Sequence, residues 1–250
     1  MDVVILTGAS RGLGRAMAEQ LLAADRLLLT ISRRPDASLE ALAQAKGTRL
    51  EQWGLDIAND IGAAARLEAW LRKHAAESFT TATLINNAGI LGAVGPVQAS
   101  DAETLAATLR IGLEASALLT SAFLRATDGW AAQRRILNIS SGAGRRAIAG
   151  WAGYCAAKAG LDHLSRVVAE DEGRRPNGAK IVSLAPGVID TGMQADLRAA
   201  DGSGFPDQAT FKEMKATGQL ASAQDAAARV LAYLARADFG ANPVADVRDA

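Results

Sequence analysis

The fold is decided near the start of the chain, by residues 3–14, VVILTGASRGLG. The apolar run 3–6 predicts a strand buried on both faces, and Leu13, Met17 and Leu21 follow at helical spacing. The G-x-x-x-G-x-G turn between them lets the backbone approach a pyrophosphate at the N-terminus of the helix. The stretch therefore predicts the phosphate site of a dinucleotide, although glycines here also suit a turn that serves geometry alone. The residues expected to form it are Gly8, Ser10, Arg11, Gly12, Leu13 and Gly14.

Downstream of this stretch, short apolar runs alternate with longer patterns of helical spacing. Further strands are expected at 27–31, 83–85, 135–139 and 180–184, and helices at 61–76, 103–125, 154–170 and 222–235. Ser100 with Glu103 resembles a capping box, and Ser222 with Asp225 opens the last helix in a similar way. The alternation predicts one α/β domain over residues 1–250, a doubly wound Rossmann-type parallel sheet flanked by helices on both faces.

Residues 187–218 interrupt the alternation. They contain several glycines, Phe205 and Pro206, and their apolar residues have little periodicity. An irregular stretch of this length within a compact domain is often functional, so we expect a substrate lid here. The alternative is a pair of short helices with weak sequence signals.

Composition excludes several classes of protein. Among 250 residues, 27 Lys and Arg balance 27 Asp and Glu, so the chain lacks the basic surplus typical of nucleic-acid binding. The apolar runs are too short to span a bilayer, and the start lacks the basic and apolar regions of a secretory signal. The single cysteine, Cys155, and the isolated His74 and His163 predict neither a disulfide nor a metal site. We expect a cytoplasmic protein with no nucleic-acid or membrane partner.

The second predicted strand bears on cofactor choice. It ends in Ser32, Arg33 and Arg34, where a protein selecting NAD usually carries an acidic residue that binds the ribose 2′-hydroxyl. A guanidinium instead binds a 2′-phosphate, and Arg11 is close enough in sequence to assist. These residues predict NADP(H), unless the two arginines are merely solvated. Asp56 is expected either beside the adenine or as the cap of the following helix.

Three side chains are candidates for the chemistry. Ser141 follows the predicted strand 135–139, and Tyr154 and Lys158 share one helix face because they are four residues apart. A tyrosine with the usual pKa of about 10 is a poor acid–base group, and a nearby ammonium favours its phenolate. Together the three could exchange a proton with a carbonyl while a nicotinamide exchanges hydride. Taken singly, they also fit a helix cap, a surface aromatic and a solvated charge.

With these motifs in order along the chain, the sequence resembles the short-chain dehydrogenase/reductase family. The matching pieces are TGASRGLG, NNAG at 86–89, Ser141 with Tyr154-x-x-x-Lys158, and PGVIDT at 186–191. The resemblance implies that Tyr154 is the acid–base, that Lys158 binds the ribose and tunes Tyr154, and that Ser141 orients the carbonyl. It also implies that the cofactor is lined by Asn86, Asn87, Ala88, Gly89, Pro186, Gly187, Val188 and Thr191. Family members pair as homodimers or homotetramers, which is therefore expected here.

A narrower resemblance joins the chain to the subgroup of sepiapterin reductases and bacterial benzil reductases. It rests on GYCAAK at 153–158, LAPG at 184–187 and DTGMQ at 190–194. It implies an NADPH-dependent carbonyl reductase acting on a small-molecule ketone or vicinal dicarbonyl, with Met193 and Asp246 as substrate candidates. Trp151, which precedes the helix of Tyr154, is a third candidate, with plain packing as the alternative. One departure is Gly112, where many relatives have an asparagine that holds a proton-relay water. The departure leaves open an alternative, a non-catalytic NADP(H)-sensing or interaction protein on the same fold.

Overall fold

A computed structural model describes residues 1–59, 62–74 and 78–249. Within these ranges the strands form one parallel sheet in the order β3-β2-β1-β4-β5-β6-β7, which confirms the doubly wound fold. The order reverses beside β1, because the chain first winds outward to β3 and then returns to β4 on the other side. The strands are β1 Asp2–Thr7, β2 Arg26–Ser32, β3 Arg49–Gly54, β4 Thr81–Asn86, β5 Gln133–Ile139, β6 Lys180–Ala185 and β7 Val244–Asp246.

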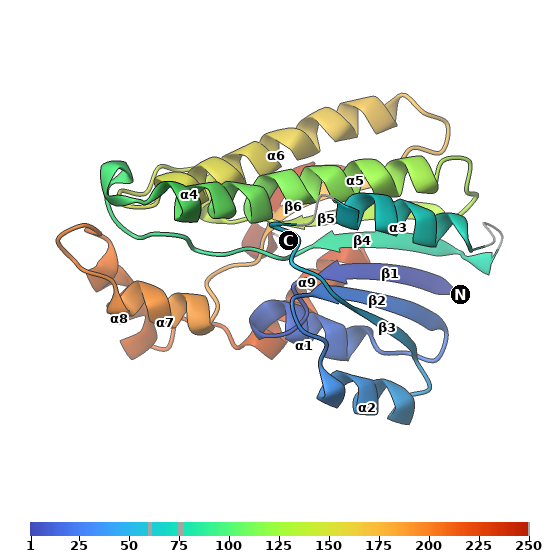
Figure 1. Ribbon diagram of the computed structural model, residues 1–250, viewed down its shortest axis with the longest axis horizontal. Coiled ribbons are helices and arrows are strands. Elements are labelled where there is room, and N and C mark those ends of the chain that lie inside the picture. Colours follow the sequence, from blue (N-terminus) through green and yellow to red (C-terminus); the bar gives the residue numbers. More distant parts are fainter. Residues whose placement is uncertain (60–61, 75–77, 250) are drawn as a thin grey trace.

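Helices cover both faces of this sheet (Figure 1). One face carries α1 Gly12–Leu21, α2 Ala37–Ala45 and α9 Ala223–Leu234; the other carries α3 Gly62–Arg72, α4 Ala102–Leu109, α5 Ala115–Ala126 and α6 Ala152–Gly173. Met17 on the first face and Phe123 on the second are fully buried. Burial of apolar side chains on both sides explains why the strands are nearly continuous apolar runs.

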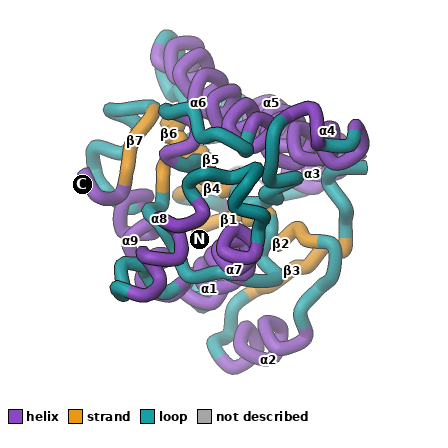
Figure 2. The backbone as a smooth tube through the Cα atoms, turned by 90° about the vertical axis from the view of Figure 1, so that its left-hand side faces the viewer, coloured by secondary structure: helices purple, strands orange, loops and turns teal. Residues whose placement is uncertain are grey.

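Two further helices, α7 Gly192–Ala199 and α8 Gln208–Ala216, lie beyond the carboxyl ends of the strands (Figures 1 and 2). Both fall within residues 187–218, so the segment does contain the pair of short helices that was the alternative prediction. Phe205 and Phe211 pack with Trp151 in an apolar cluster that is separate from the apolar cores on the two faces of the sheet. The position of this cluster places the segment over the edge of the sheet where ligands bind in this architecture.

Several elements differ from the sequence predictions. The strands β3 and β7 and the helix α2 were not predicted, because these short elements lack a clear apolar run. The expected cap Ser100 is wrong: the side chain of Asp101 accepts the hydrogen bond from Thr104 N at 2.8 Å. Ser222 caps α9 as predicted. Two predicted helix ends, at positions 61 and 76, lie outside the described residues.

The predicted helix 103–125 is interrupted by a π-helical turn, Arg110–Glu114, which separates α4 from α5. The whole stretch Ala102–Ala126 is long and apolar enough to cross a membrane by length and composition alone. However, its Leu119 and Phe123 lie in the core beneath the sheet, as expected for the core helix of a globular domain.

Candidate active site

The carboxyl ends of the parallel strands open into a cavity of about 700 Å³. The cavity brings together the three predicted catalytic residues, the three substrate candidates and the predicted cofactor residues, apart from Arg34 and Asn86. The predicted residues that line it are Gly8, Ser10, Arg11, Gly12, Leu13, Gly14, Ser32, Arg33, Asp56, Asn87, Ala88, Gly89, Ser141, Trp151, Tyr154, Lys158, Pro186, Gly187, Val188, Thr191, Met193 and Asp246.

The turn between β1 and α1, residues 8–14, is built for close approach of the backbone. Gly8 and Gly12 have φ of +72° and +54°, which L side chains rarely adopt. A Cβ on Gly14 would lie 2.1 Å from the carbonyl oxygen of Gly8, so no side chain fits there. Asn87 braces the turn because its Nδ2 donates to the carbonyls of Thr7 and Gly8, at 3.0 and 3.2 Å.

The N-terminus of α1 fits the pyrophosphate of a dinucleotide. Arg11 occupies the N-cap, and its side chain makes no capping hydrogen bond. Arg11 therefore does not cap the first backbone N–H groups of the helix, and the residues that carry them, Gly12, Leu13 and Gly14, line the cavity at the positive end of the helix dipole. A diphosphate would supply the missing acceptors.

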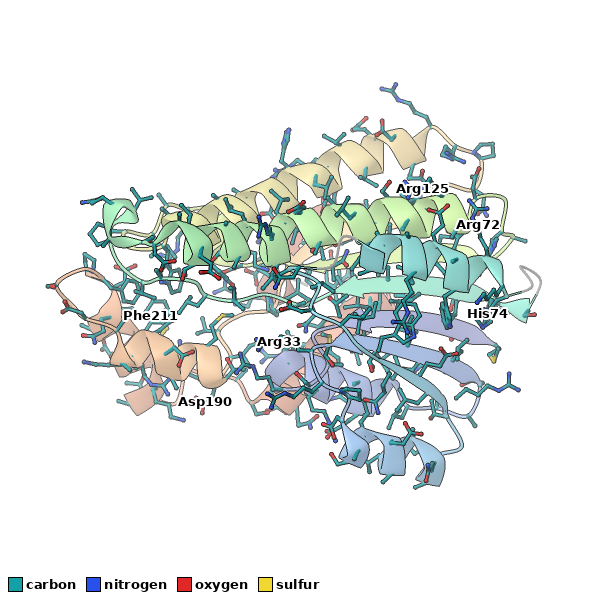
Figure 3. All side chains as sticks on the ribbon, viewed as in Figure 1. Arg33, Arg72, His74, Arg125, Asp190 and Phe211 are labelled. Carbon is teal, nitrogen blue, oxygen red and sulfur yellow. The ribbon has the colours of Figure 1, made fainter. Side chains whose placement is uncertain are left out.

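The two arginines after β2 have different positions. Arg33 lines the cavity, and in Figure 3 it lies at the end of the strand layer nearest to α7, whereas Arg34 is outside the lining. The nearby carboxylate of Asp36 accepts a hydrogen bond from the Ser38 hydroxyl, pairs with Arg15 and caps α2, and these hydrogen bonds lower its pKa to about 2. Asp36 is therefore already engaged and does not take the place of the ribose-binding acid of NAD-selective proteins.

Two other predicted residues have structural partners. Asn86 is buried and outside the cavity lining, where its Nδ2 donates to Thr120 Oγ1 and Asn138 Oδ1, so its side chain joins β4 to α5 and β5. Asp56 lines the cavity and also accepts hydrogen bonds from Ala58 N and Asn59 Nδ2. Its printed partners lie in the turn at 56–59, and the residues directly before Gly62 lie outside the described ranges.

The candidate catalytic residues meet at the ends of β5 and α6. Burial raises the pKa of Tyr154 to about 12, and the hydrogen bond with Ser141 acts in the opposite direction. Lys158 is 4% exposed, and its Nζ donates to the carbonyl of Ile139 at 2.7 Å. Burial lowers the pKa of Lys158 to about 8, while the negative charge of Asp162 opposes this shift. In this structure burial thus outweighs the expected effect of Lys158 on Tyr154, and the phenol keeps its proton at neutral pH.

Gly112 lies buried in the π-helical turn, against the helix that carries Tyr154 and Lys158. A Cβ at this position would approach the Cβ of Ala157 to 2.9 Å. The asparagine that many relatives have here would therefore not fit without a shift of α6. The packing of α6 against this turn gives a steric reason for the departure from the family pattern.

The far wall of the cavity is apolar and aromatic. Trp151 stacks on Phe205 with ring centroids 5.3 Å apart and also contacts Phe211 and Tyr154. Phe211 extends this cluster from α8 (Figure 3), where its ring stacks on Phe205 with centroids 5.6 Å apart. Sequence reasoning identified Trp151 and Met193 but missed Ile148, Gln194, Leu197, Phe211 and Met214, which also line the cavity. Most of these lie within residues 187–218, where the apolar residues carry no readable period.

Asp246 reaches the cavity from the end of β7, but its carboxylate is already engaged. It accepts hydrogen bonds from Arg248 Nε at 2.8 Å, Arg248 NH2 at 2.6 Å and the Arg248 backbone N–H at 3.0 Å. The NH1 atom of Arg145 lies 3.9 Å from Asp246 Oδ2. Few of its lone pairs are left for a substrate, unless Arg248 moves.

A glycine-turn dinucleotide site and a Ser, Tyr and Lys set, on one parallel sheet, define a dehydrogenase or reductase architecture. The family model described as short chain dehydrogenase matches residues 2–202, and the chain belongs to this short-chain dehydrogenase/reductase family of oxidoreductases. It is 34% identical over 239 residues to a benzil reductase ((S)-benzoin forming) of Bacillus cereus, covering 96% of each chain. It is 32% identical over 258 residues to the sepiapterin reductase of Meriones unguiculatus, covering 99% of this chain and 96% of that protein.

A solved structure agrees with these sequence relatives. A short-chain dehydrogenase/reductase from Burkholderia vietnamiensis matches with a TM-score of 0.65 and 34% identity, over 100% of this chain and 99% of that one. The chain is thus a family member near the benzil and sepiapterin reductases, as its motifs predicted.

Proposed function

We propose that the protein is an NADPH-dependent carbonyl reductase that reduces a ketone or a vicinal dicarbonyl, of the benzil or sepiapterin type. The observation that carries this proposal is the convergence of Ser141, Tyr154 and Lys158 with the phosphate turn in one cavity. The aromatic wall around Trp151 and Phe211 suits a substrate with an aryl or fused-ring group. Arg33 lies in the lining, and the carboxylate of Asp36, three residues later, is engaged by Ser38 and Arg15, which favours NADP(H) over NAD(H).

Each residue then has a defined role. The hydroxyl of Ser141 donates to the carbonyl oxygen of the substrate and holds it near the phenol of Tyr154. Tyr154, with a pKa near 12, keeps its proton at neutral pH and donates it to that oxygen as negative charge develops, which favours reduction. The ammonium of Lys158 lies on the same helix face, where it binds the ribose and stabilises the tyrosinate left behind. The bound dinucleotide supplies the hydride.

Assays of NADPH and NADH oxidation with benzil, other diketones, sepiapterin and simple ketones test this proposal. Turnover of a vicinal dicarbonyl with NADPH preferred is expected. Tyr154→Phe should abolish turnover and leave NADPH binding largely intact. The matched control is Tyr233→Phe, which removes the only other tyrosine and should be nearly neutral. Substantial activity in Tyr154→Phe would refute the role of Tyr154.

The second candidate function is a non-catalytic NADP(H)-sensing protein, favoured by Gly112 in place of the relay asparagine. Tight cofactor binding without turnover of any carbonyl would support it. The three intact catalytic side chains favour the enzyme, because a sensor has no need of them.

Two structural proposals accompany this function. We infer that residues 187–218, with α7 and α8, act as a lid that covers the substrate end of the cavity. We also propose a cytoplasmic homodimer or homotetramer formed through α4, α5 and α6, where Leu109 and Val167 are 36% and 46% exposed. A monomer in light scattering at micromolar concentration would refute the assembly.

A further inference from the structure

Asp162 is a buried carboxylate that the proposed chemistry does not use. It lies on α6 two turns after Tyr154 and one turn after Lys158, so the three side chains follow one face of the helix. It is only 2% exposed. A carboxylate in such a place is costly unless its charge is compensated by hydrogen bonds and cations.

The compensation comes from three elements around the active site. Ser140 Oγ at the end of β5 and Ser183 Oγ on β6 donate to Asp162 Oδ1, at 2.5 and 2.6 Å. Arg145, in the turn after β5, donates from Nε to Oδ2 at 3.3 Å. Ser140 directly precedes Ser141, so the carboxylate of Asp162 fixes the end of the strand that carries the catalytic serine.

The same carboxylate belongs to a row of alternating charges. Arg145 lies between Asp162 and Asp246, and Asp246 in turn pairs with Arg248. The ionisable groups that the described residues place around Lys158 and Asp162 include Tyr154 on α6, Arg145 before it, and Asp246 with Arg248 at the end of the sheet. Of these groups, Asp162 is the anion one helical turn from Lys158, and the ion pair with Arg145 partly neutralises the charge of Asp162.

We propose that Asp162 is a positioning residue for the reduction, which holds the strand end that carries Ser141 and places a negative charge one helical turn from Lys158. The inference rests on the proposed function for the roles of Lys158 and Ser141; the hydrogen bonds that join Asp162 to the two strands do not depend on it.

The sign of the effect follows from the geometry. In Asp162→Asn the shape is kept and the negative charge is lost, so burial acts on Lys158 with less opposition. Because the opposing negative charge is lost, the pKa of Lys158 is expected to fall below about 8. In Arg145→Met the negative charge of Asp162 loses its ion pair and acts more strongly on Lys158, so the pKa of Lys158 is expected to rise.

The experiment is a titration of Lys158 in the cofactor-free protein by NMR of isotopically labelled lysine side chains, assigned with Lys158→Met. Opposite shifts in Asp162→Asn and Arg145→Met are expected. The high-pH limb of kcat/KM for carbonyl reduction should move in the same direction as each titration. Because Arg145 is partly exposed, its variant is expected to fold even if Asp162→Asn does not.

Glu172→Gln is the matched control. Glu172 lies on the same helix, is 5% exposed, and pairs with Arg134 at 3.3 Å, far from the cavity. It should lower the melting temperature and leave the Lys158 titration unchanged. An unchanged Lys158 titration in the Asp162 and Arg145 variants, or an equal shift in Glu172→Gln, would overturn the proposal. If the Tyr154→Phe variant keeps its activity while the Lys158 titration still shifts in the Asp162 and Arg145 variants, the result would refute the proposed function and leave the role of Asp162 intact.

Discussion

Replacement of Arg33 by alanine is expected to weaken NADPH binding by about 10- to 30-fold and to leave NADH binding almost unchanged. Arg33 lines the cavity at the end of β2, where the ribose of a dinucleotide lies in this fold. A hydrogen bond to a charged group contributes about 1.5–3 kcal/mol. Arg33 is exposed to solvent, so we take the lower part of this range, about 1.5–2 kcal/mol, which corresponds to about 10- to 30-fold in Kd.

The assay is titration of both cofactors against the quenching of tryptophan fluorescence, at fixed ionic strength. Arg34→Ala is the matched control, since this neighbouring arginine is also exposed but lies outside the cavity. It should change neither Kd by more than about 2-fold, the scale of exposed charges. Equal losses for NADPH and NADH in Arg33→Ala, or a larger selective loss in Arg34→Ala, would refute the assignment of the 2′-phosphate to Arg33.

Three further outcomes are expected. Gly112→Asn should lower stability by about 1–3 kcal/mol by overpacking against Ala157, and a second change, Ala157→Gly, should recover part of the loss in thermal unfolding; no recovery would mean that the contact is not limiting. Lys158→Met should be inactive yet more stable at pH 7 by on the order of 2–3 kcal/mol, since burial holds the pKa of Lys158 at about 8. Between about pH 8 and 10.5 Lys158 is neutral in the folded protein and protonated in the unfolded chain, so the stability of the wild type rises with pH over this window. The stability difference between Lys158→Met and the wild type should therefore shrink, and a stability difference independent of pH would contradict this account. Phe211→Ala should reduce kcat/KM for benzil at least about 10-fold more than for 2,3-butanedione, measured as NADPH oxidation, because only the larger diketone needs the aromatic wall.

The parts of the site that sequence reasoning found are those with local rules. The glycine turn, Ser141 and the Tyr154–Lys158 pair are recognisable because backbone geometry and helical spacing fix their positions relative to a strand or helix. The alternating apolar runs likewise predicted a doubly wound parallel sheet, although not its strand order or the strands β3 and β7.

The parts that sequence reasoning missed depend on contacts between distant segments. Phe211 lines the cavity only because α8 folds back over the strand ends, and the role of Asp162 depends on serines from two different strands. Arg33 and Arg34 are adjacent and chemically identical, and only the path of the chain after β2 separates them. In the sequence, Gly112 indicated only the loss of a relay asparagine, whereas the structure shows that a larger side chain at this position would collide with Ala157.

The two walls of the cavity differ in their tolerance to mutation. At Gly14 even one added methyl group meets the backbone, so the phosphate side admits almost no variation. On the opposite side, α7 and α8 meet the rest of the chain through flexible side chains such as Met193 and Met214, which can be exchanged without moving a strand. Divergence within such a scaffold will therefore collect on one wall. A mutant library confined to α7 and α8 is therefore expected to change the substrate specificity of this protein while its cofactor binding is retained.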